Sequence, residues 1–158
     1  MKNRYERLYK RAKAIMEDKT PLKKDCGLLC GAACCKGDSE TGMLLFPFEE
    51  TSLSVVEKDG VRLCVCDGSC DRRERPLSCV IFPFFPYITP EGRVKVIPDI
   101  RGAEICPIVR NFSEVRLDRR FLRRVKKVGR LLSEDTECRA FLEEISREMD
   151  VYIELSSK

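Results

Sequence analysis

Apolar residues recur three and four positions apart near both ends of the chain, which is the spacing of an amphipathic helix. This spacing predicts one helix over residues 3–18 and two more between residues 113 and 150. Ser133 or Asp135 is placed to cap the last of them. Gly129 interrupts the preceding helix, and we expect that helix to be weakest there.

Between the helical ends, apolar and polar residues alternate as they do in half-buried strands. Residues 61–66 form one predicted strand, in which alternate residues share a face. The predicted core face carries Val61, Leu63 and Val65, and the opposite face carries Arg62, Cys64 and Cys66. Residues 87–97 are a predicted hairpin around the turn Thr89–Gly92, and residues 151–155 are a predicted final strand.

The stretch over residues 36–60 has no regular period. Turn-forming residues predict a turn at Gly37–Gly42 and another at Asp59–Gly60. Between them we expect a short extended piece at Met43–Phe48 and then an acidic helix at Glu49–Val56.

Cysteine is the most unusual component of the sequence, since four of the 10 cysteines fall between Cys26 and Cys35. Thiols packed this densely are joined as disulfides, bound to a metal or active in redox chemistry. Eight cysteines lie in turn-rich segments, where the chain can bend to bring sulfur atoms together. These candidate metal ligands are Cys26, Cys30, Cys34, Cys35, Cys66, Cys70, Cys79 and Cys106.

The expected cellular location favours metal over disulfides. Residues 1–24 lack the apolar core of a signal peptide, and no run approaches the roughly 18 apolar residues of a membrane span. We therefore expect a cytoplasmic protein with no membrane partner, in which thiols stay reduced. Histidine is absent, so any zinc site would be built from thiolates, and we expect the cofactor to be an iron–sulfur cluster or zinc. The cysteine spacings differ from those of zinc ribbons and also from those of ferredoxins. The missing histidine, the lack of zinc-finger spacing and the nearby arginines and phenylalanines together favour iron and sulfur slightly.

Some cysteines have a second interpretation. Cys138 is in phase with the apolar stripe of the last predicted helix, so we interpret it as a small core residue. Cys64 shares a strand face with Cys66, but one metal rarely takes both residues of a Cys-x-Cys pair, and its role stays open. The adjacent Cys34 and Cys35 imply two metals, a cluster or one spare thiol. The general alternative is that several cysteines are buried as small apolar residues.

Charged and aromatic residues follow the second group of cysteines. Arg72, Arg73 and Arg75 lie close to Cys70, where they would offset the negative charge of several thiolates. The run Phe82–Pro86 holds three phenylalanines and two prolines, which excludes a regular helix. We expect this run to form an apolar lid that keeps water off a cysteine site.

Two cysteine motifs together resemble a known family. They are Cys-x3-Cys-x3-Cys-Cys, which begins at Cys26, and Arg-Pro-x-x-Cys-x-x-Phe-Pro, which begins at Arg75. The pattern is similar to the YkgJ-type cysteine-cluster proteins, described as zinc- or iron-chelating, one branch of which is the flagellin lysine N-methylases. The resemblance spans residues 26–110 and implies metal binding. Its methylase branch implies a metal-dependent lysine N-methylase-like enzyme, or an accessory protein, that acts on a protein partner.

Charge is distributed unevenly along the chain. Residues 1–24 carry about +6 and residues 110–130 about +7, whereas residues 131–158 carry about −5. The basic helix over residues 116–130 offers a third functional alternative, a nucleic-acid-binding module that contacts phosphates. Aromatic side chains for base stacking are not interleaved there, so we favour a solvated helix face that is partly paired with the acidic last helix.

These patterns combine into one expectation for the fold and the function. Residues 1–158 are predicted to form a single α+β domain. In it, a small antiparallel sheet and irregular cysteine-rich metal-binding loops, within residues 26–110, are covered by the N-terminal helix and by helices over residues 113–150. The favoured function is a metal-binding protein that holds an iron–sulfur cluster or zinc through cysteine thiolates.

Overall fold

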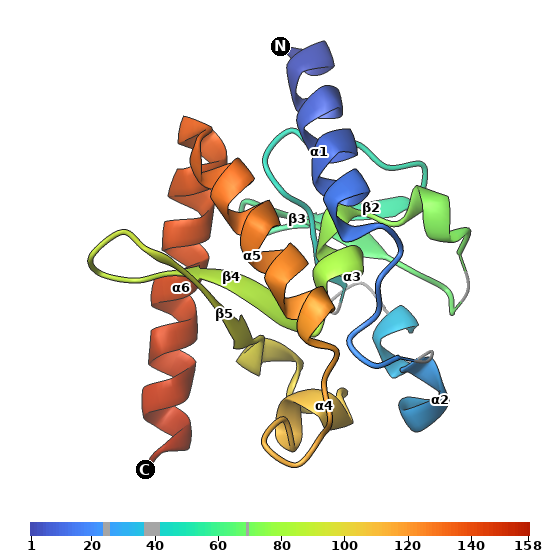
Figure 1. The fold of residues 1–158 in the computed structure, drawn as a ribbon. Coiled ribbons are helices and arrows are strands. Elements are labelled where there is room, and N and C mark those ends of the chain that lie inside the picture. Colours follow the sequence, from blue (N-terminus) through green and yellow to red (C-terminus); the bar gives the residue numbers. More distant parts are fainter. Residues whose placement is uncertain (24–25, 37–41, 69) are drawn as a thin grey trace.

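A β-hairpin is covered by two helices from the C-terminal part of the chain (Figure 1). The computed structural model describes residues 1–23, 26–36, 42–68 and 70–158. The long helices are α1 (Lys2–Met16), α5 (Arg119–Ser133) and α6 (Thr136–Ser156). Helices α5 and α6 pack on the hairpin, and α1 lies against α5. The predicted α+β class is confirmed, and so are the three predicted helices.

The described strands form two antiparallel sheets instead of the single predicted sheet. The first contains β1 (Met43–Leu44), β2 (Ser54–Lys58) and β3 (Val61–Val65), in the order β1-β3-β2. The second is the hairpin of β4 (Phe84–Ile88) and β5 (Val94–Pro98), which the alternation predicted. A turn at Asp59–Gly60 joins β2 to β3 as expected. The turn predicted at Gly37–Gly42 lies largely outside the described residues.

The helix predicted over Glu49–Val56 is wrong, because no residue of this fully described stretch is helical. The side chain of Glu49 is buried and accepts hydrogen bonds from the backbone N–H groups of Phe46 and Leu77. From Ser54 onwards the chain pairs with β3. The acidic residues that suggested a surface helix therefore include a buried carboxylate, and a strand follows it.

Six short helical segments connect the longer elements in the described parts of the chain. They are α2 (Gly27–Cys30), η1 (Ala33–Cys35), η2 (Arg72–Glu74), α3 (Leu77–Ile81), η3 (Ile100–Gly102) and α4 (Pro107–Arg110). Several cysteines, such as Cys30, Cys35 and Cys79, lie on these segments. The irregular loops predicted for the cysteines are thus partly short helical turns.

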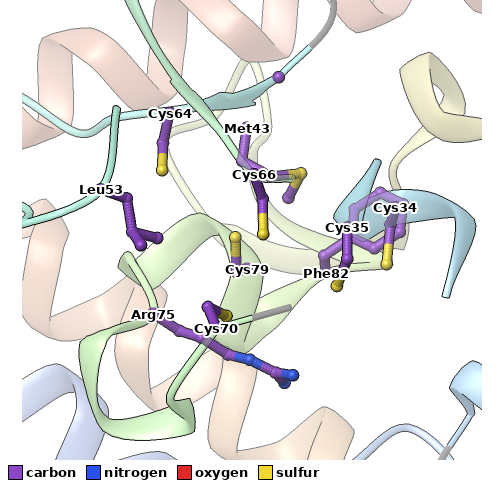
Figure 2. A pocket seen from close by; sticks show the side chains of 11 residues that line it. Cys34, Cys35, Met43, Leu53, Cys64, Cys66, Cys70, Arg75, Cys79 and Phe82 are labelled. Carbon is purple, nitrogen blue, oxygen red and sulfur yellow. The ribbon is translucent and has the colours of Figure 1, made fainter. Parts of the chain in front are cut away.

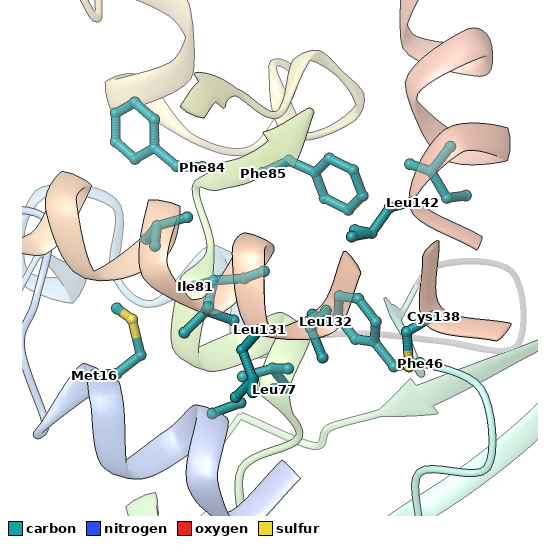
Figure 3. Packing of buried hydrophobic residues seen from close by; sticks show 14 of the residues in the cluster. Met16, Phe46, Leu77, Ile81, Phe84, Phe85, Leu131, Leu132, Cys138 and Leu142 are labelled. Carbon is teal, nitrogen blue, oxygen red and sulfur yellow. The ribbon is translucent and has the colours of Figure 1, made fainter. Parts of the chain in front are cut away.

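One apolar cluster joins the long helices to the hairpin (Figure 3). Met16 of α1, Phe121 of α5 and Leu142 of α6 are all fully buried in it. Gly129 lies where α5 meets the hairpin. A Cβ atom at that position would be 2.4 Å from Cβ of Pro86 and 2.8 Å from Cγ1 of Val94. The glycine that the sequence suggested as a weak point therefore allows the helix to approach the sheet closely.

The final strand predicted over residues 151–155 is also wrong, because α6 continues through it to Ser156. Val151, Ile153 and Leu155 are exposed on this helix. Their alternation resembles that of a strand, but extending an existing helix requires less free energy than forming a strand that has no partner.

We predict that Gly129→Ala lowers the free energy of unfolding by about 1–3 kcal/mol, because the added methyl group overlaps Pro86 and Val94. The helix propensity of alanine alone would instead raise stability by about 1 kcal/mol. Urea denaturation monitored by circular dichroism measures the difference. The exposed Arg147→Ala on α6 serves as a control and is expected to change stability by less than about 0.5 kcal/mol. A Gly129→Ala protein as stable as the parent would contradict the close approach.

Candidate metal centre

Six cysteines line one cavity of about 50 Å³. They are Cys34, Cys35, Cys64, Cys66, Cys70 and Cys79. Figure 2 shows their side chains around a common space, together with the apolar Met43, Leu53 and Phe82 and the basic Arg75. The space suffices for a metal ion or a few water molecules.

Separate stretches of the chain bring these sulfur atoms together. The helical turn η1 supplies Cys34 and Cys35, and α3 supplies Cys79. The other three cysteines come from β3 and the residues that follow it. An isolated β-bridge between Lys36 and Asp67 holds the end of η1 beside the segment after β3. The cavity therefore depends on contacts between segments that are far apart in the sequence.

A buried carboxylate fixes α3, the helix that carries the last of these cysteines. Glu49 accepts the backbone N–H of Leu77, in the first turn of α3, at 2.6 Å and the N–H of Phe46 at 3.1 Å. The hydroxyl of Ser78 donates to the carbonyl of Leu44 in β1. Burial raises the pKa of Glu49, although the two N–H donors counteract the rise. These bonds dock α3 on the three-stranded sheet.

Cys64 lines the cavity, although the sequence did not decide whether it is a ligand. It is 2% exposed and sits on the central strand, opposite Met43 of β1 and Val55 of β2. Val61, on the face predicted to be the core face, is 37% exposed, so the prediction is wrong for Val61 and Cys64, while the other residues of the strand are half-buried on both faces. Alternation shows which residues share a face but not which face is covered. The Cys-x-Cys pair with Cys66 was the signal that could have placed Cys64 in the site.

Five of the eight predicted ligands line the cavity, namely Cys34, Cys35, Cys66, Cys70 and Cys79. Cys26 and Cys30 are outside its lining, but both lie close enough to Cys34 for their charges to raise its pKa. Cys106 is 7% exposed at the start of α4 and belongs to the apolar core. The structure therefore brings two predicted ligands near the cavity and places the third in the core.

Cys138 lies in the core, as its place on the apolar stripe predicted. It is fully buried, and its Sγ lies 3.4 Å from the hydroxyl of Tyr9. Its backbone N–H donates to Asp135, which caps α6 as one of the two predicted candidates. Burial raises the pKa of the Cys138 thiol to about 12. This cysteine is a packing residue that does not line the cavity.

The predicted phenylalanine lid does not form as a unit. Phe82 lines the cavity. Phe84 and Phe85 are each 4% exposed and lie in the main core on β4. The ring centroid of Phe84 is 6.2 Å from that of Phe121. Because α5 and α6 both pack on β4, side chains on both of its faces are buried away from the cysteines.

Burial favours the neutral thiol form of several cavity cysteines. It raises the pKa of Cys34 to about 12, and the neighbouring Cys35 adds to the rise. Burial likewise raises the pKa of Cys35, Cys64 and Cys79. Metals bind the thiolate form, so a metal that binds here displaces protons.

Arg75 supplies positive charge to the cavity. Burial alone would lower the pKa of Arg75, but the nearby thiols of Cys70, Cys35 and Cys79 raise it overall. Its charge also lowers the pKa of Cys35, against the larger effect of burial. Arg73, by contrast, is exposed and forms an ion pair with Asp71 at 2.9 Å. Of the three arginines predicted to offset thiolate charge, only Arg75 lines the cavity.

The sulfur atoms of the cavity cysteines are suitable ligands for a metal that prefers sulfur, although their present positions do not form a complete coordination site. No disulfide joins any of the ten cysteines, all of which are described. Among the described residues, no group of three or more Cys, Asp or Glu side chains is already positioned to hold a metal ion. Zinc and iron–sulfur clusters commonly take four thiolates, and the cavity offers six cysteines. Binding would thus require these side chains to close around the metal.

In comparisons with known proteins, no family model, no curated protein and no solved structure matches the chain. The similarity to the YkgJ type therefore rests on the two cysteine motifs alone. Among the described residues, no helix has both the length and the apolar character needed to cross a membrane.

We predict that Arg75→Gln raises the pKa of Cys35, because the substitution removes the charge that now lowers it. In the metal-free protein, alkylation of Cys35 at about pH 8 should slow about threefold. Peptide mass spectrometry after a timed pulse of iodoacetamide gives the rate. Arg73→Gln is the matched control, since Arg73 faces Asp71 and should leave the rate unchanged. Equal effects of the two substitutions would show that Arg75 does not act on the cavity.

Proposed function

We propose that this protein binds an iron–sulfur cluster or zinc through cysteine thiolates of the cavity between η1, β3 and α3. The observation that carries the proposal is the convergence of six cysteines on one small space. Cys34, Cys66 and Cys79 would belong to the ligand set, and the other three cavity cysteines would complete it. When bound, the metal would cross-link these segments and, as a cluster, would carry electrons.

The surroundings of the sulfur atoms support this proposal over simple packing. A cysteine that only fills core space behaves as a small apolar residue, as Cys138 does within the apolar cluster. The cavity cysteines instead surround an open volume and adjoin a guanidinium, that of Arg75. Positive charge and hydrogen bonds to sulfur are the means by which a protein compensates a thiolate-rich centre.

The apolar part of the lining also suits a metal centre. Met43, Leu53 and Phe82 form this part of the wall. Apolar walls limit the access of water and thereby tune a bound metal. The absence of histidine makes the available soft ligands almost wholly thiolates. This donor set and the resemblance to zinc- or iron-chelating proteins both support sulfur-bound metal, and a reducing cytoplasm would keep the thiols available.

Purification without oxygen tests the proposal directly. We expect a brown protein with broad absorption near about 400 nm, which comes from charge transfer between thiolate and iron. Iron, sulfide and zinc analysis of the same sample identifies the metal. A colourless protein that contains zinc without iron or sulfide would select zinc within the proposal. Protein that is well folded and takes up neither metal would contradict it.

Substitutions separate ligands from packing residues. We expect Cys79→Ser to reduce metal content sharply and to lower the melting temperature of the metal-bound protein, because metal binding energy adds to folding energy. Cys138→Ala is the matched control. It removes a fully buried sulfur outside the cavity, so it should keep full metal content at a modest cost in stability. Loss of metal in the Cys138→Ala protein alone would reverse the two assignments.

The raised thiol pKa values predict a pH dependence of metal binding. Because burial raises the pKa of Cys34 and Cys79, these two thiols stay protonated at neutral pH, and each releases a proton when it binds metal, so affinity increases with pH. The rise in melting temperature caused by zinc should therefore be larger at about pH 8 than at about pH 6. Calorimetry of the metal-free protein with added zinc measures it. A rise that is independent of pH would mean that the thiols are not the ligands.

A further inference from the structure

We propose that the adjoining outer faces of α1 and α5 bind the phosphate backbone of duplex nucleic acid. This basic face comprises Arg7 and Arg11 of α1 and Arg123, Lys127 and Arg130 of α5, and all five residues are exposed. The inference concerns a surface separate from the cysteine cavity, and it holds whether or not a metal binds there.

Packing brings the two basic helices together. They lie in contact and run in opposite directions, since Arg124 of α5 donates to the carbonyl of Ile15 near the end of α1. At the other end, Arg4 of α1 pairs with Asp135, which follows α5. The two basic helices, more than a hundred residues apart in the sequence, thus lie side by side.

Helical geometry places the cations on the outside of both helices. On α5, the buried stripe includes Phe121, Val125 and Val128, and Arg123 and Lys127 lie on the opposite side. On α1, the buried residues are Tyr5, Tyr9, Ala12 and Met16, and Arg7 and Arg11 lie on the opposite side. Each helix has 15 residues, so it is roughly 22 Å long and can span several phosphates.

The expected partners for these charges are not engaged. The sequence led us to expect pairing between the basic helix and the acidic α6, but none of the ion pairs among the described residues joins α5 to α6. Nor does any of these ion pairs include a residue of the basic face. The acidic residues at the two ends of the helix pair form ion pairs with other arginines, Glu17 with Arg124 and Asp135 with Arg4.

The character of the surface favours a duplex over other polyanions. Four of the five cations are arginines, whose planar guanidinium matches the geometry of phosphate oxygens. Exposed aromatic residues, which would stack on single-stranded bases, are absent from the described α1 and α5. Large exposed apolar residues, which would enter a lipid surface, are likewise absent from the described residues of both helices, and Met1 directly precedes α1. Backbone contacts without base contacts predict binding that is independent of sequence.

Fluorescence anisotropy with a labelled 20-base-pair duplex, measured over a series of KCl concentrations, tests this proposal. Five phosphate contacts predict a slope of about −4.5 for the logarithm of the association constant against the logarithm of salt concentration. The double variant Arg11→Gln/Lys127→Gln should reduce the size of this slope by about 2 and weaken binding about tenfold or more at moderate salt. The matched control is Arg93→Gln/Lys95→Gln on the β4–β5 hairpin, which makes the same change in charge and should leave both values unchanged.

Three results would overturn the proposal. One is the lack of duplex binding at low salt by protein with an unchanged melting curve. Another is an equal loss of binding in the two double variants, which would assign the effect to net charge. The last is binding to phosphatidylserine vesicles through Arg11 and Lys127 without binding to the duplex, which would identify an anionic membrane as the partner.

Discussion

The buried carboxylate of Glu49 is the contact on which the cysteine cavity depends most. Its two oxygens accept N–H groups from Phe46 and Leu77, so one side chain joins the segment after β1 to the start of α3. A buried N–H group left without an acceptor costs about 1–3 kcal/mol, which makes these bonds difficult to exchange for others. The position of Cys79, and through it the shape of the cavity, follows from this carboxylate.

The helices were predictable because each has a local cause. Apolar spacing marked all three long helices, and Asp135 was a recognisable cap for the last. Local patterns failed where a distant partner decides the structure. In the sequence alone Glu49 resembles a surface acid, because its burial depends on a hydrogen bond from the N–H of Leu77 in α3. The alternating residues from Val151 to Leu155 have no strand partner, so they continue the helix α6.

The candidate site was predictable in composition but not in arrangement. Turn-rich sequence identified five of the six cavity cysteines, because sulfur atoms in bending segments can be brought together. The role of Cys64 depended on which face of β3 would be covered, and Cys106 lies in the core although it is in a turn-rich segment. Similarly, the charges of α1 and α5 were visible in the sequence, but only packing showed that the two helices lie side by side.

The contact between α1 and α5 also orders events during synthesis. Helix α1 is made before α5, which packs against it and follows more than a hundred residues later. At a translation rate of roughly 5–20 residues per second, several seconds pass between synthesis of the cysteine segments and synthesis of the helix that completes the core. During that interval the thiols are open to oxidants. The protection of these cysteines therefore depends on a helix, α5, that is made after all of the cavity segments.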